Sequence, residues 1–223
     1  MQGMGPEQGF WTLLSQDEQD ALTGLGRIRA FSPGATMCSE GEPTTHLFIL
    51  VAGWVKILSV TSEGRELMLA LRGQGDIVGD VAAVTTGHRN ATIKAVGIVR
   101  ALIVRYDTFG SFLDSHPGAD RAYRTVMTRR WNDAATELRS RPLTTGAQRL
   151  ATLLLDLTER YGTSANGAMP LSQEELASLV GTSRATVTRA FVRWRKRGLI
   201  RTGPRRITIV DPKGLRQAAG EQP

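Results

Sequence analysis

Short apolar segments separated by glycine fill residues 31 to 105, and the segments are rich in Val, Ile and Leu. Ala91 to Ala95 alternates between apolar and polar residues, which predicts a half-buried strand. Glu63-Gly64 lies between two apolar runs and predicts a tight hairpin turn. A capping-box pattern at Ser15 and Glu18 predicts a short helix ahead of these strands. This pattern of short strands and turns is typical of an antiparallel β-sandwich or β-roll.

From Asp120 to Arg139 the apolar period becomes helical. The residues at steps of three and four are Tyr123, Met127, Trp131, Ala134 and Leu138. They form one face of a helix about 30 Å long. This stripe packs either on the chain's own strand-rich domain or on the same stripe of a second copy, and the pattern does not choose between them. Arg141-Pro142 ends the helix and places a domain boundary near residues 140 to 144.

Residues 171 to 210 have the pattern of two short helices followed by a hairpin. Ser172 and Glu175 form a capping box for the first helix, and Gly181 permits a sharp turn before the second. The buried face of the second helix has the spacing i, i+3, i+4 and i+7, at Val187, Ala190, Phe191 and Trp194. The basic segment from Arg201 to Arg206 and the alternating run after it predict a β-hairpin wing. Two such helices and a wing predict a winged helix-turn-helix.

The distribution of charge along the chain indicates the chemical class of a binding partner. The chain has 223 residues and a net charge of +7. Residues 1–118 contain 9 basic and 12 acidic residues, whereas residues 119–223 contain 19 and 9. No acidic residue occurs between Leu176 and Val210. A polyanion bound by the C-terminal half alone is therefore expected.

Composition excludes several other classes of protein. The single cysteine, Cys38, excludes a disulfide framework and a cysteine-rich metal or iron–sulfur site, and His46, His88 and His116 lack metal-ligand spacing. The start of the chain has no secretory pattern, and the longest uncharged apolar run has nine residues against the roughly 20 needed to span a bilayer. The sequence contains no P-loop and no hydrolase motif, so an enzyme is not favoured. A cytoplasmic protein without a membrane partner, a metal or a catalytic residue is expected.

The second helix of the predicted helix-turn-helix is suited to the major groove of double-stranded DNA. Arg184 and Arg189 lie where an arginine contacts guanine edges, and Thr186 and Thr188 suit phosphates. Arg184→Ala is expected to relax preference at one base pair, and Arg205→Ala to weaken binding to all sequences alike. The candidate DNA-binding residues are Ser183, Arg184, Ala185, Thr186, Thr188, Arg189, Arg193, Arg205 and Arg206.

The segment from Gly181 to Arg189, followed by Gly198-Leu199-Ile200, resembles the recognition-helix signature of the Crp/Fnr superfamily of bacterial transcription regulators. The resemblance covers nearly the whole chain and implies an α+β fold. It implies a cyclic-nucleotide-binding-like β-roll over residues 10–118, a dimerisation helix over 119–141 and a winged helix-turn-helix over 144–217. The implied partners are double-stranded DNA with a palindromic operator, a second copy of the chain, and RNA polymerase. Ala185 stands where the family often has a Glu that accepts from cytosine, so a different half-site is expected.

The same resemblance implies a cyclic nucleotide, cyclic AMP or cyclic GMP, as effector. It implies that Arg89 pairs with the cyclic phosphate, that the backbone near Gly79 and Asn90 approaches it, and that Asp80 binds the ribose hydroxyl. The implied effector residues are Gly79, Asp80, Val81, Arg89, Asn90 and Ala91.

Three departures from the family pattern leave an alternative to this effector site open. Asp80 replaces Glu, Asn90 replaces a hydroxyl residue, and Ala134 and Ala135 replace the Ser/Thr residues that bind adenine. Weak adenine selectivity is expected because Ala cannot hydrogen-bond a base edge. In the alternative, Asp80 and Arg89 form a structural salt pair in a degenerate pocket, and the regulator works without a ligand.

Overall fold

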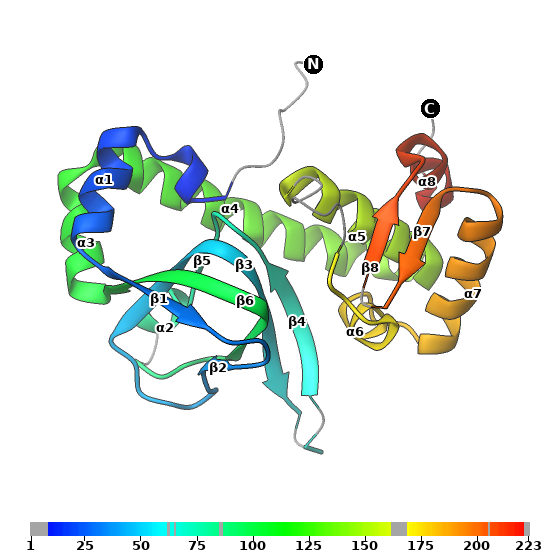
Figure 1. The fold of residues 1–223 in the computed structure, drawn as a ribbon, viewed down its shortest axis with the longest axis horizontal. Helices are drawn as coiled ribbons and strands as arrows, with labels where there is room; N and C mark the ends of the chain where they lie inside the picture. Colours follow the sequence, from blue (N-terminus) through cyan, green and yellow to red (C-terminus); the bar gives the residue numbers. More distant parts are fainter. Residues whose placement is uncertain are drawn as a thin grey trace. The chain divides into compact units, whose positions relative to one another are not determined.

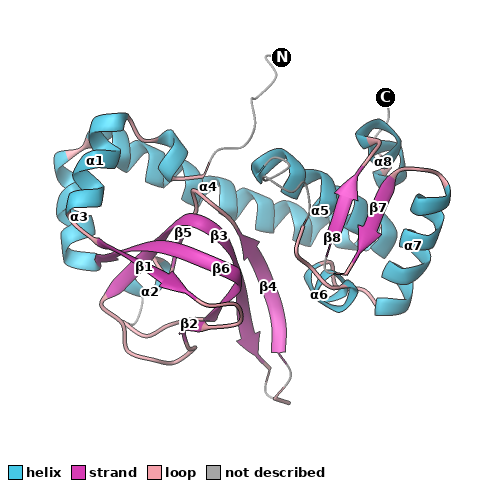
Figure 2. Ribbon diagram, viewed as in Figure 1, coloured by secondary structure: helices cyan, strands magenta, loops and turns pink. Residues whose placement is uncertain are grey.

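The computed structural model describes residues 9–61, 63–64, 66–84, 87–161, 169–204 and 206–220. They belong to two compact units, Gln8–Asn132 and Asp133–Pro223, and helix α4 contributes to both. In chain order (Figures 1 and 2) the elements are η1 (Trp11–Leu13), α1 (Gln16–Gly24), β1 (Arg27–Phe31), β2 (Thr36–Cys38), β3 (His46–Val60), β4 (Glu66–Arg72), β5 (Ile77–Val78), α2 (Val81–Val84), β6 (Thr92–Arg105), α3 (Tyr106–Ser115), α4 (Pro117–Ser140), η2 (Arg141–Leu143), α5 (Gly146–Tyr161), α6 (Gln173–Leu179), α7 (Arg184–Lys196), β7 (Ile200–Gly203), β8 (Arg206–Ile209) and α8 (Pro212–Ala219).

Antiparallel pairing builds the sheet of the first unit. Strands β1, β6, β3 and β4 lie side by side in that order, while β2 also pairs with β6 and β5 with β3. Strands β3 and β4 form the predicted hairpin, and Gly64 near its turn has a φ of 78°. Thr92 to Ala95 alternates between half-buried and buried positions, as the sequence pattern predicts. The expected antiparallel β-roll is therefore confirmed.

Strand β3 is buried on both faces because it separates two hydrophobic cores. Leu47 and Ile49 pack into one core, and Phe48 and Leu50 pack into the other. Side chains alternate across a strand, so one continuous apolar run supplies both cores. The first core also contains Phe109 of α3 and continues into α4.

The second unit is built around a capped pair of helices. The predicted capping box of Ser172 and Glu175 forms before α6, and the one predicted at Ser15 and Glu18 forms before α1 of the first unit. Helix α7 packs on α6 and α5, α5 also packs on α8, and β7 and β8 form the antiparallel wing. The α+β class and the winged helix-turn-helix are confirmed.

Helix α4 runs three residues further at its start than the predicted range of 120 to 139 and ends at Ser140. Arg141-Pro142 follows in a short 3-10 turn, so the proline ends the helix where the sequence predicts.

Candidate functional site

Helix α7 exposes a basic face, because its apolar face packs into the core of the second unit. Ser183 caps the helix by accepting a hydrogen bond from the backbone N–H of Thr186 at 3.2 Å. The turn before it holds Gly181 at a φ of 60°, and Arg149 of α5 donates to the carbonyls of Val180 and Gly181. The predicted core residues Val187, Ala190, Phe191 and Trp194 are all buried. The opposite face exposes Arg184, Ala185, Thr188, Arg189, Arg193 and Lys196.

Hydrogen bonds within the second unit hold several of these side chains in place. Arg189 Nη2 donates to Thr186 Oγ1 at 3.2 Å, so the threonine whose backbone N–H is capped by Ser183 also positions an arginine. Thr188 Oγ1 lies 2.7 Å from Gln173 Oε1 and donates to it. The hydroxyl proton of Thr188 is thus used inside the protein, which the sequence pattern did not reveal because Gln173 lies on another helix.

A cavity of about 480 Å³ lies between α6, α7 and the wing. Arg184 and Arg195 both line it, and Arg195 Nη1 donates to Thr202 Oγ1 of the wing at 3.3 Å. Gln173, Arg195 and Thr202 are not among the predicted DNA-binding residues, because nothing in a linear pattern shows that they meet. Of the two predicted wing residues, Arg206 is exposed on β8, and Arg205 lies outside the described residues.

Arg89 is the most unusual polar side chain in the first unit. It is 3% exposed, and its Nη1 atom donates to the Gly79 carbonyl at 3.1 Å and to the Tyr106 hydroxyl at 3.3 Å. Its guanidinium lies 5.3 Å from the centre of the Phe48 ring. Its Nη2 atom is buried and has no hydrogen-bond partner. A buried cationic donor without an acceptor is costly, so the site is suited to an anionic oxygen.

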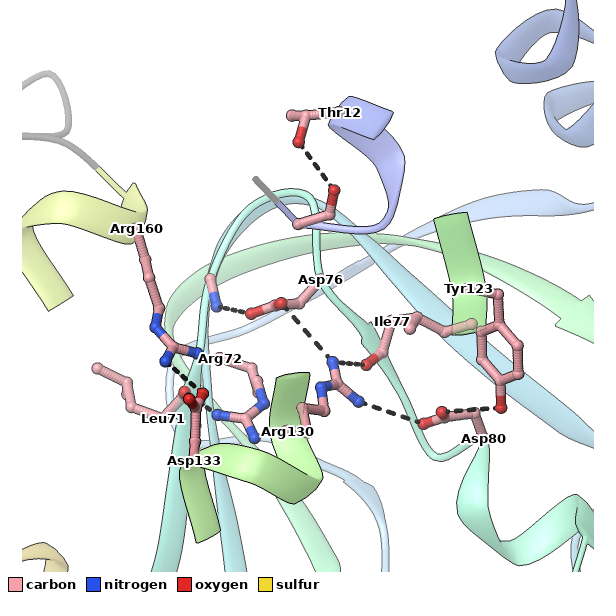
Figure 3. A network of polar contacts seen from close by, with 12 residues as sticks. Thr12, Leu71, Arg72, Asp76, Ile77, Asp80, Tyr123, Arg130, Asp133 and Arg160 are labelled. Atoms are coloured by element: carbon pink, nitrogen blue, oxygen red, sulfur yellow. Dashed lines mark hydrogen bonds and ion pairs between the residues drawn. The ribbon is translucent and has the colours of Figure 1, made fainter. Parts of the chain in front are cut away.

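Asp80 has different partners from Arg89. The Tyr123 hydroxyl of α4 donates to Asp80 Oδ2 at 3.2 Å, and Arg130 Nη1 of α4 lies 3.8 Å from Asp80 Oδ1 (Figure 3). Burial, with the neighbouring Asp80 carboxylate, raises the pKa of Tyr123, so its hydroxyl remains a donor at neutral pH. Arg130 also donates to the Ile77 carbonyl at 2.7 Å and lies 3.6 Å from Asp76. The structure therefore corrects the alternative of a direct Asp80–Arg89 pair. Arg89 donates to the Gly79 carbonyl and the Tyr106 hydroxyl, whereas the Asp80 carboxylate faces Tyr123 and Arg130.

The other predicted effector residues differ in how far their side chains are buried. Gly79 adjoins Asp80 and has a φ of 76°, while Ala91 is buried. Val81 and Asn90 are exposed. A side chain at position 79 would collide with Arg89 Nη1, so the glycine is required for the close approach of this arginine.

Gly79→Ala is expected to destabilise the protein more than Gly97→Ala. Both glycines have a positive φ, of 76° and 80°, which costs about 1–2 kcal/mol for any other residue. Only Gly79 would bring its new methyl group against Arg89, since nothing lies near the corresponding position at Gly97. Overpacking adds about 1–3 kcal/mol. Urea unfolding of both variants measures the difference, and equal losses would contradict the role given to Arg89.

The apolar stripe of α4 divides into two parts. Tyr123 and Met127 are half-buried and pack against the core of the first unit. Trp131 and Leu138 are 75% and 72% exposed, and Ala134 between them is also exposed. The second part of the stripe is therefore the part most exposed in the single chain.

Two protein families match two separate parts of the chain. Residues 28–116 match the cyclic nucleotide-binding domain family, and residues 148–218 match the Crp-like helix-turn-helix domain family. The CRP-like cAMP-activated global transcriptional regulator of Mycobacterium tuberculosis is 33% identical over 193 residues, which are 85% of this chain and 86% of that protein. The chain belongs to the Crp/Fnr superfamily of transcription regulators. The Cyclic AMP receptor protein of Thermus thermophilus is 26% identical over 92% of this chain and 94% of its own.

Solved structures support the Crp/Fnr fold. FixK2 from Bradyrhizobium japonicum has a TM-score of 0.74 at 19% identity, and the alignment covers 89% of this chain and 99% of that one. As a member of this superfamily the chain is a DNA-binding transcription regulator, and its relatives are regulators rather than enzymes.

Membrane-spanning helices and metal-binding clusters were searched for among the residues that the structure describes, and neither is present there. None of their helices is long and apolar enough to cross a membrane. No cluster of three His, Cys, Asp or Glu side chains among them is arranged to hold a metal ion.

Proposed function

We propose that this regulator binds palindromic operators as a homodimer, with α7 of each copy in the major groove of one duplex. The observation that carries the proposal is the exposed face of α7, which is basic and lies in a stretch without acidic residues from Leu176 to Val210. The two recognition helices of the dimer must lie about 34 Å apart to enter successive major grooves. Residues 10–118 then form the sensor, 119–141 the dimerisation helix and 144–217 the DNA-binding domain.

Base contacts and phosphate contacts come from different parts of this surface. Arg184 and Arg189, near the start of α7, are suited to guanine edges. Ser183, Thr186 and Arg193 are suited to the backbone, as are Arg206 and the neighbouring Arg205 of the wing. Ala185 offers no acceptor to cytosine, so the half-site differs from the commonest family operator at that base pair.

Arg184→Ala is expected to weaken specific binding by about 1–3 kcal/mol and to relax preference at one base pair. Arg206→Ala is expected to weaken binding to every sequence alike, because a phosphate contact carries no sequence information. Binding of each variant to operator and random DNA, measured at several salt concentrations, separates the two effects. Equal losses on both DNAs for both variants would contradict this division.

A cyclic nucleotide in the β-roll is the proposed effector. Arg89 supports it, because its buried Nη2 atom lacks an acceptor and a cyclic phosphate supplies an anionic oxygen. The bound nucleotide shifts the packing of α4 across the dimer and so changes the spacing of the two α7 helices. The regulator acts on chromosomal DNA in the cytoplasm, with RNA polymerase as its further partner.

Selection of bound sequences from a random DNA pool tests this function. The selection is done without nucleotide, with cyclic AMP and with cyclic GMP. A palindrome enriched more strongly with one nucleotide supports the gated dimer. The same palindrome enriched equally in all three selections supports a regulator that works without this ligand. Enrichment of single half-sites would contradict the dimer.

A further inference from the structure

We infer that Arg160 determines which half-site spacing this regulator accepts in its operator, because it joins the end of α4 to α5 across the turn that connects them. The inference rests on the proposed homodimer and names a positioning residue for it. Arg160 is not one of the candidate DNA-binding residues, and it acts through the helices that carry them.

A short connection separates α4 from the helices of the DNA-binding unit. Helix α4 ends at Ser140, the 3-10 turn Arg141–Leu143 follows, and α5 begins at Gly146. The boundary between the two compact units lies inside α4, so its turns from Asp133 onward group with the DNA-binding unit. A connection of this kind permits different angles between two helices unless a contact beyond the turn restrains them.

Arg160 of α5 makes such a contact. Its Nη2 atom donates to Asp133 Oδ2 of α4 at 2.6 Å (Figure 3), and its Nε atom donates to Asp156 Oδ1 on α5 at 2.8 Å. The Arg160 side chain is 17% exposed, so both charge-assisted hydrogen bonds are largely shielded from water. Asp133 lies about 10 Å before the end of α4, and Arg160 lies about 20 Å beyond the start of α5. A contact this far from the turn restrains the angle between the two helices.

Helix α5 is in turn joined to the recognition helix α7. Arg149 Nε of α5 donates to the Val180 carbonyl at 2.9 Å, and Arg149 Nη2 donates to the Gly181 carbonyl at 3.1 Å, in the turn before α7. Helix α7 also packs directly on α5. A fixed angle between α4 and α5 therefore fixes the direction of α7 relative to the end of α4. In the proposed dimer this sets the separation of the two α7 helices, which must match the half-sites on DNA.

Operators that differ only in half-site spacing test the inference. Inserting two base pairs at the centre of the selected palindrome moves the half-sites apart by about 7 Å and rotates them by about 70°. The unmodified chain is expected to bind this longer operator more weakly than the palindrome by about tenfold or more. Arg160→Met is expected to reduce the ratio to about threefold or less, because each α7 then adjusts to its own half-site. Fluorescence anisotropy measures binding to both operators and to DNA with one half-site.

Two further variants separate this role from support of the fold. Asp133→Ala removes the α4 carboxylate, which is 43% exposed, and is expected to tolerate the longer operator as Arg160→Met does. Arg216→Met removes the ion pair between α8 and Glu159, the neighbour of Arg160 on α5, and is expected to retain the discrimination of the unmodified chain. All three variants are expected to bind a single half-site within about twofold of the unmodified chain, since no candidate DNA-binding residue changes.

Spacing discrimination that is unchanged in both Arg160→Met and Asp133→Ala overturns the inference. A large loss of half-site binding in both variants also overturns it, because the contact would then support the fold of the DNA-binding unit. If only Arg160→Met loses half-site binding, the spacing discrimination of Asp133→Ala decides the outcome. Equal binding of both operators by the unmodified chain overturns the inference and leaves the proposed function standing. If the unmodified chain has no preference for a palindrome over one half-site, the proposed dimer and the inference both fail.

Discussion

Trp131→Ala combined with Leu138→Ala is expected to convert the proposed dimer to a monomer and to reduce affinity for a palindromic operator by about 100-fold or more. Both side chains are largely exposed in the single chain, at 75% and 72% of their area. Truncating both side chains is therefore expected to change the stability of the folded monomer little and to destabilise the proposed dimer. Buried tryptophans are common energetic centres of protein interfaces.

Ile98→Ala is the matched control for this variant. Ile98 is 70% exposed but lies on β6, away from the stripe of α4. It is expected to leave the dimer unchanged. Sedimentation equilibrium measures the oligomeric state, and DNA with one half-site measures the affinity of a single α7. A double variant that remains dimeric would contradict the assignment of this stripe to the interface.

The α4 stripe also shows how far periodicity predicts packing. A step of three or four residues identifies one face of a helix, and α4 has that face. It does not identify what covers each part of the face. Tyr123 and Met127 meet the core of their own unit because Phe10 and Phe109 come from distant parts of the chain. The first alternative drawn from the sequence, packing on the chain's own domain, applies to the first part of the stripe, and packing on a second copy stays a prediction for the exposed part.

Local signals were the most reliable guide to the second unit. The capping box of Ser172 and Glu175 and the turn at Gly181 depend on residues close together in the chain, and both were predicted. Helix α8 was missed although its signals are local too. Asp211 caps it, Pro212 begins it, and Gly220 ends it in the left-handed conformation.

The family resemblance selects Asp80 and Arg89 as effector residues, and both are buried. It does not predict the contacts that they make. The partners of Asp80 are Tyr123 and Arg130, more than 40 positions along the chain. Such a contact depends on how α4 packs on the sheet, and no spacing in the sequence encodes it.

Arg130→Met is expected to destabilise the chain by about 3–5 kcal/mol, which is the usual cost of removing one partner from a buried ion pair. The side chain of Arg130 is 19% exposed and serves three acceptors at once, namely the Ile77 carbonyl and the carboxylates of Asp76 and Asp80. Methionine retains much of the volume but removes the positive charge between two buried carboxylates. Urea unfolding followed by circular dichroism measures the loss.

Arg124→Met, on the same helix, is the control that separates the effect of burial on stability from the effect of ion-pair distance. Arg124 makes a shorter ion pair, with its Nε atom 2.7 Å from Asp120 Oδ2, but its side chain is 77% exposed. Water already screens both charges of that pair, so its removal is expected to change stability little. If distance governed the energy, Arg124→Met would be the more damaging variant. The prediction is the reverse, because the free energy of each pair depends on what its carboxylates contact when the arginine is gone, and only Asp76 and Asp80 are buried away from water.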